Sequence, residues 1–156
     1  MPSVRSAVAP AAAREDAQTR QLEEDIVMWR AGVYGGWAFA IQAWGSGVLT
    51  DDVLKAVSAG TRAVTLTSTA TIPWFNHYDQ SEQICSFDPS MPWLRHGASP
   101  EHLNTAILQA GLGPEPHTRR PDYVAGMLLL GENAFGLDLP YDAVVQGELL
   151  GAVIPG

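Results

Sequence analysis

The segment from Ser58 to Gly113 constrains the fold of this chain more than any other part. Between Thr61 and Thr71, apolar residues alternate with threonines, which is typical of a strand with one apolar and one polar face. The polar run Asp79–Gln83 has the composition of a turn, and Ile84–Phe87 returns as the partner strand. A connection rich in tryptophan, proline and histidine then leads into a helix. The segment therefore predicts antiparallel strands followed by a helix.

Helix signals occur in three places, at 50–60, 99–111 and 121–136. The first two begin at a threonine and a serine that are suited to the N-cap, and the second also has a proline at its first helical position. All three end at a glycine, the residue most common after a helix C-terminus. A shorter helix is expected at 141–149.

The remaining apolar segments read as strands. Residues 25–30 and 37–44 flank a glycine cluster, Gly32, Gly35 and Gly36, and predict a hairpin, and residues 150–155 predict a closing strand. Helices and strands do not alternate regularly, so the class predicted is α+β. We expect one domain over residues 25–156, with a mainly antiparallel sheet packed against two to four helices. Residues 1–24 are expected to be a disordered or loosely helical arm.

Charge and cysteine content limit the partners that we expect. The formal net charge is −8 and Lys55 is the only lysine, so binding to nucleic acids or to anionic membranes is not expected. No segment approaches 18 consecutive apolar residues, so no membrane span is predicted. Cys85 is the only cysteine, which precludes an intrachain disulfide and favours the cytoplasm. The expected partner is a protein, a peptide or a small molecule, and the oligomeric state stays open.

Three polar residues are candidates for proton chemistry if the protein is an enzyme. His77 lies among aromatic residues in WFNHYDQ, where it could act as a general base or simply be an exposed turn residue. Asp88 follows a strand and could orient His77 or His96, or cap a turn. No spacing typical of metal ligands or of a nucleotide-binding loop is present, so neither a metal site nor a cofactor is predicted.

A second group of residues predicts a binding surface. Trp74 and Trp93 each follow a proline in a connecting segment, where burial in a core is less expected than in a strand or helix. Phe75 and Tyr78 flank His77 and could line the same groove. Arg95, next to His96, could bind an anion together with the amide groups of the following helix, or could form an ion pair with Asp88. The alternative for each tryptophan is a packing role in the core.

One pattern resembles a known family. The residues FDP…P…G.SP..L, which begin at Phe87 and continue through Gly97, Ser99 and Pro100, are similar to a family of small actinobacterial proteins known as domain of unknown function 6461. The similarity covers about residues 29–113, with a looser match at 124–154. The resemblance implies one compact α+β domain and brings no activity with it.

Two function classes fit these observations. The first is a non-catalytic binding protein, such as an immunity, accessory or peptide-binding factor, that uses an aromatic groove. The second is a small cofactor-independent enzyme of secondary metabolism, in which His77 and Asp88 transfer a proton inside an aromatic cavity. Because no catalytic motif is present, the sequence favours the binding protein.

Overall fold

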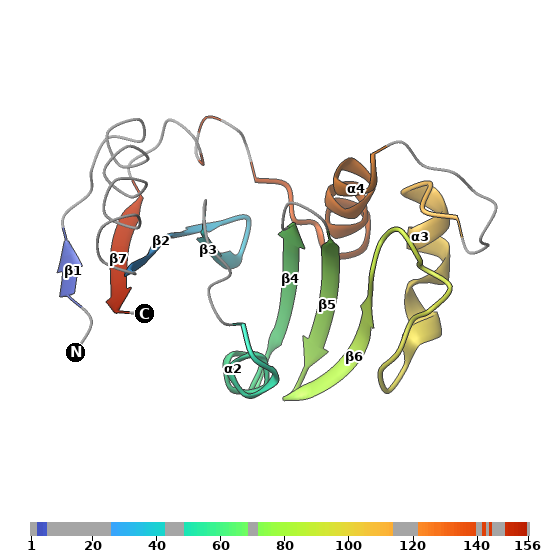
Figure 1. Ribbon diagram of the computed structural model, residues 1–156, viewed down its shortest axis with the longest axis horizontal. Coiled ribbons are helices and arrows are strands. Elements are labelled where there is room, and N and C mark those ends of the chain that lie inside the picture. Colours follow the sequence, from blue (N-terminus) through green and yellow to red (C-terminus); the bar gives the residue numbers. More distant parts are fainter. Residues whose placement is uncertain are drawn as a thin grey trace. The chain divides into compact units, whose positions relative to one another are not determined.

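The structure is a computed structural model that describes residues 3–5, 26–42, 49–68, 72–113, 122–139, 142, 144 and 149–155. The chain divides into two compact units: residues 1–47 together with 138–156, and residues 48–137. Each unit carries its own antiparallel sheet (Figure 1).

The sheet of the first unit has the strand order β1-β7-β2-β3. Its strands are β1 (Ser3–Arg5), β2 (Ile26–Tyr34), β3 (Trp37–Ile41) and β7 (Leu150–Pro155). Strands β2 and β3 form the predicted hairpin, in which Tyr34 pairs with Trp37. The two residues between them, Gly35 and Gly36, have φ angles of 58° and 83°. Two positive φ angles in a row are typical of the tight hairpin turns that glycine favours.

Gly32 was predicted to belong to this turn, and the structure places it inside β2 instead. It pairs with Phe39 of β3, and a Cβ atom at Gly32 would lie 2.8 Å from Cζ of the Phe39 ring. Glycine therefore fits here because the Phe39 ring packs close to the backbone of β2, not because the chain turns.

The sheet of the second unit is a three-stranded meander, β4-β5-β6. Its strands are β4 (Arg62–Ser68), β5 (Pro73–Asp79) and β6 (Glu82–Phe87). The predicted turn is correct: β5 and β6 meet at Gln80 and Ser81, which both have positive φ angles. However, β5 was expected to be a connection, and it is the central strand. Residues 84–87 in β6 therefore pair with β5, and not with the strand that begins after Thr61 as the sequence suggested. The pattern of β5 was hard to recognise because each face of the strand carries both aromatic and polar residues and its first position is a proline, which strands tolerate there.

The predicted helices of this unit are present with shorter bounds. They are α2 (Asp51–Val57), the 3₁₀ helix η1 (Pro100–Leu103), α3 (Asn104–Gln109) and α4 (Tyr123–Phe135). The Thr50 hydroxyl caps α2 by accepting from the Val53 amide, and Asp122 caps α4 in the same way. Ser99 makes no side-chain cap, because the segment after it begins as a 3₁₀ helix.

One face of the three-stranded sheet, here called the inner face, carries the core of the second unit. Phe75 lies 5.2 Å from Phe87 and 6.3 Å from Phe135 of α4 between ring centroids. Leu103 of η1 and Ile107 of α3 are also buried. Leu108, the residue of α3 that follows Ile107, points away from this core and is 56% exposed.

The fold class is α+β with antiparallel sheets, as predicted, although the strands form two sheets rather than one. Within the expected arm, Ser3–Arg5 form β1 and pair with β7. Residues 6–25 lie outside the described part, so the arm stays a prediction. The helix expected at 141–149 also lies largely outside it.

Candidate functional site

Side chains alternate between the two faces of β5, so the predicted site residues on this strand lie on opposite faces of the sheet. Phe75 is fully buried on the inner face, and His77 on the same face is 6% exposed. Trp74, Asn76 and Tyr78 point to the opposite face, here called the outer face. Phe75 is therefore a core residue and not the groove wall that the sequence suggested.

A hydrogen-bond network across three strands fixes Trp74 on the outer face. The indole Nε1–H of Trp74 donates to Ser86 Oγ at 2.9 Å and to Asn76 Oδ1 at 3.2 Å. The Ser86 hydroxyl donates to Asn76 Oδ1 at 2.7 Å, and the Asn76 amide donates to Thr65 Oγ1 at 2.9 Å. Because these groups bond one another, the indole ring is held in one orientation while its side chain stays partly exposed.

His96 lies beside Trp74. Its backbone forms both hydrogen bonds of an antiparallel bridge with Ser86, at 2.8 and 3.0 Å, and the centroids of its ring and of the Trp74 ring are 6.2 Å apart. The following Gly97 runs so close to β6 that a Cβ atom there would lie 2.4 Å from the Ile84 carbonyl oxygen. The exposed His96 and the half-buried Trp74 thus form one surface. Trp93 is also half-buried, but within the described part of the chain its ring does not pair with either of these two.

The Arg95 guanidinium is hydrogen-bonded to residues of its own loop and of the helices that follow it. The side chain is 8% exposed, and the guanidinium donates to the Pro92 carbonyl, to Glu101 Oε2 at 3.0 Å and to Asn104 Oδ1 at 2.6 Å. Hydrogen bonds from Asn104 and then from Arg95 lower the pKa of the Glu101 carboxyl. Arg95 therefore ties the loop after β6 to η1 and α3, and does not form the ion pair with Asp88 that the sequence left open.

Asp88 is a turn residue. Its Oδ1 accepts from the Ser90 amide and from the Ser90 hydroxyl, both at 2.7 Å, and its carbonyl accepts from the Met91 amide. This arrangement is typical of an Asx turn. The structure does not bring Asp88 to His77 or His96, so the predicted histidine–carboxylate pair is not formed.

His77 has a different partner, His102 of η1, with His77 Nδ1 3.1 Å from His102 Nε2. Burial, and then the nearby His102, lowers the pKa of His77 to about 4, so the ring is neutral near pH 7. Cys85, directly opposite His77 on β6, has its pKa raised to about 11 by burial, so its thiol is protonated. Neither group is prepared to act as a nucleophile or to receive a substrate proton.

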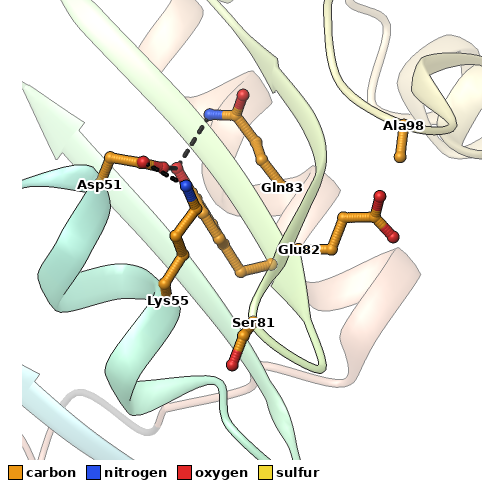
Figure 2. Close-up of a pocket in the computed structure, with 7 residues that line it drawn as sticks. Asp51, Lys55, Ser81, Glu82, Gln83 and Ala98 are labelled. Atoms are coloured by element: carbon orange, nitrogen blue, oxygen red, sulfur yellow. Dashed lines mark hydrogen bonds and ion pairs between the residues drawn. The ribbon is translucent and has the colours of Figure 1, made fainter.

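A hollow of about 840 Å³ lies on the outer face at the other end of β5 (Figure 2). Most of the residues that line it carry a polar group, although about half of the lining surface is apolar; they are Asp51, Lys55, Tyr78, Ser81, Glu82, Gln83 and Ala98. Among the residues predicted from the sequence, only Tyr78 belongs to this lining. The signal that could have located it is the i, i+4 pair of Asp51 and Lys55 on α2.

The Tyr78 hydroxyl is the centre of the polar contacts in this hollow. It donates to Asp51 Oδ1 at 2.8 Å and accepts from Gln83 Nε2 at 3.0 Å, and Lys55 Nζ lies 2.6 Å from Asp51 Oδ2. Burial and the bond to Asp51 raise the pKa of Tyr78 to about 12. The bonds from Lys55 and then Tyr78 lower the pKa of Asp51, and the bond to Asp51 raises that of Lys55. The hollow thus presents a fixed carboxylate and an ammonium group, and both lie over the Tyr78 side chain, which is itself buried.

Over the described residues, no group of three or more histidine, cysteine, aspartate or glutamate side chains is arranged to hold a metal ion. In the same part of the chain, no helix is both long and apolar enough to cross a membrane.

Comparison with known proteins assigns the chain to a family. It belongs to the family of unknown function DUF6461, whose model matches residues 4–155. A search of curated proteins and a search of solved structures each found no match.

Proposed function

We propose that this member of the DUF6461 family is a non-catalytic binding protein that takes a protein or peptide partner on the outer face of β4-β5-β6. The observation that carries the proposal is the fixed orientation of the Trp74 indole by Ser86 and Asn76. A partly exposed aromatic ring that is already ordered loses little conformational entropy on binding, which is why tryptophan is frequent among the residues that dominate binding energy.

The spacing on β5 suggests the size of the partner segment. Trp74 and Tyr78 lie on one face four residues apart, which corresponds to roughly 13 Å at about 3.3 Å per residue. An extended segment of about five residues would therefore reach from the Trp74–His96 surface to the hollow at Tyr78. The polar lining of the hollow suits a charged or hydrogen-bonding side chain of the partner, and the indole suits an apolar one.

The alternative, a small enzyme that uses His77 and Asp88, has less support. Catalysis by that pair requires contact between the two side chains and access to a substrate. His77 is buried and bonded to His102, and Asp88 is bonded to Ser90. We further propose that the protein acts in the cytoplasm, since its single cysteine is a buried thiol with no disulfide to maintain.

A peptide library tests the proposal. A random library displayed on phage would be selected on the full chain, and the dissociation constants of selected peptides would be measured by fluorescence anisotropy. Trp74→Ala should weaken binding about 30-fold or more, since a residue that dominates binding contributes at least about 2 kcal/mol. Leu128→Ala, at an exposed position of α4, is the matched control and should leave binding unchanged. Equal effects of the two substitutions, or selected peptides that bind the Trp74 variant normally, would exclude this surface.

A further inference from the structure

Two histidines outside the proposed binding surface are hydrogen-bonded to each other. His77 lies on the inner face of β5 and is buried, whereas His102 in η1 is exposed. His77 Nδ1 lies 3.1 Å from His102 Nε2, and His102 Nδ1 lies 2.7 Å from the Ser99 carbonyl oxygen. The two rings therefore connect the interior of the unit to its surface through one chain of hydrogen bonds.

The Ser99 carbonyl determines where the ring hydrogens are. A carbonyl oxygen only accepts, so His102 Nδ1 must carry a hydrogen. In neutral His102, Nε2 is then bare and accepts from the Nδ1–H of His77. Neutral His77 has a single ring hydrogen, so its own Nε2 is a bare nitrogen. That Nε2 atom is buried and has no hydrogen-bond partner in the structure.

A proton on His102 changes this arrangement. The His102 imidazolium carries hydrogens on both nitrogens, so Nε2 becomes a donor and His77 Nδ1 must become an acceptor. We propose that proton uptake by the exposed His102 reverses the hydrogen bond between the two rings and converts the buried His77 from its Nδ1–H tautomer to its Nε2–H tautomer. The pair gains one proton and one positive charge, both on His102. His77 gives up its Nδ1 hydrogen to solvent and takes one at Nε2 when the segment opens.

His77 itself stays neutral in both states. Burial is the main cause that lowers its pKa to about 4; His102 also lowers it, Asp79 opposes the change and Arg62 lowers it further. The residues that face His77 from the elements around it are His102 of η1, Asp79 of β5, Arg62 of β4, Cys85 of β6 and the uncharged ring of Phe135 of α4.

The His77 ring also packs against α4. The ring centroids of His77 and Phe135 are 4.7 Å apart, in an edge-to-face arrangement. In the reversed state an N–H group replaces a bare nitrogen at the buried Nε2 of His77. The reversal therefore changes which nitrogen carries the hydrogen in a buried ring that packs against α4.

Nitrogen-15 spectroscopy of the histidine rings tests this inference. The full chain, labelled at histidine, would be followed from pH 8 to pH 5, a range in which His77 stays neutral. We expect the protonated-type and bare-type ¹⁵N signals of His77 to exchange between Nδ1 and Nε2 in parallel with the change in the ring ¹⁵N signals of His102. His102→Gln keeps an acceptor, the amide oxygen, for His77 Nδ1–H but cannot titrate, so His77 should remain the Nδ1–H tautomer throughout.

Three results would overturn the inference. One is a His77 ring that keeps the same tautomer across the titration of His102 in the unmodified chain. Another is a tautomer change that persists in His102→Gln, because the signal would then come from elsewhere. The third is a rise in melting temperature with zinc that His102→Gln abolishes, because the two nitrogens would then be metal ligands and not a hydrogen-bonded pair.

Discussion

Acid should destabilise the second unit through His77, and the size of the effect follows from its burial. The pKa of His77 is lowered to about 4 in the folded chain, against an ordinary value of 6.5. Between these values the unfolded chain binds a proton that the folded chain does not, so the free energy of unfolding falls as the pH falls. The stability that depends on a neutral His77 is fully present above pH 6.5 and is lost by about pH 4. At about 1.4 kcal/mol per pH unit, the total loss is about 3 kcal/mol.

The buried thiol of Cys85 provides the assay. Cys85 is the only cysteine of the chain and is fully buried next to His77, so a disulfide reagent reacts with it only after the unit opens. The protection of the thiol is the rate at which the reagent reacts with the urea-unfolded protein, divided by the rate at which it reacts with the folded protein at the same pH. From pH 7 to pH 4 this protection should fall roughly a hundredfold more in the unmodified chain than in His77→Leu, in which no ring can take up a proton. An equal fall in both proteins would refute the reasoning.

Three further predictions concern residues that hold the loop and the core. Gly97→Ala should lower the free energy of unfolding, measured by urea unfolding, by more than about 2 kcal/mol, because its φ of 130° is strained for alanine and its Cβ would meet the Ile84 carbonyl oxygen. Gly60→Ala, at φ 72° with no atom nearby, should lower it by only about 1–2 kcal/mol, and equal losses in the two variants would contradict the close approach at Gly97. Arg95→Lys should lower the free energy of unfolding by about 1–3 kcal/mol, since an ammonium group cannot replace the planar guanidinium on its three acceptors; an unchanged urea midpoint would contradict this. Cys85 in the native protein at pH 7 should resist alkylation by iodoacetamide under conditions that modify the unfolded chain completely, and rapid labelling would show that the unit is open.

The sequence predicted those elements whose signals are local. The cap at Thr50, the glycine pair at 35–36 and the polar turn at 80–81 all lie where the sequence placed them, because capping and turn formation depend on a few adjacent residues. The central strand β5 was missed. Its face assignment depends on the strands and helices that cover each side, and that information is not local.

The candidate site was predicted in part for the same reason. Trp74 and His96 were identified from their composition and do lie side by side. The partner of His77 was not predicted, because His102 is 25 residues away in sequence and reaches His77 only through the packing of η1 on β6. The hollow at Tyr78 likewise joins α2 to the β5–β6 turn, which are distant in the chain.

The most direct test of the proposed function observes the tryptophan side chains during binding. The five indole N–H groups of the ¹⁵N-tryptophan protein give separate signals, and Trp74→Phe identifies that of Trp74. When a library-selected peptide is added, the account predicts that the Trp74 signal moves progressively as binding saturates. A Trp74 signal that does not respond at saturation, with shifts confined to the other tryptophans, would contradict it.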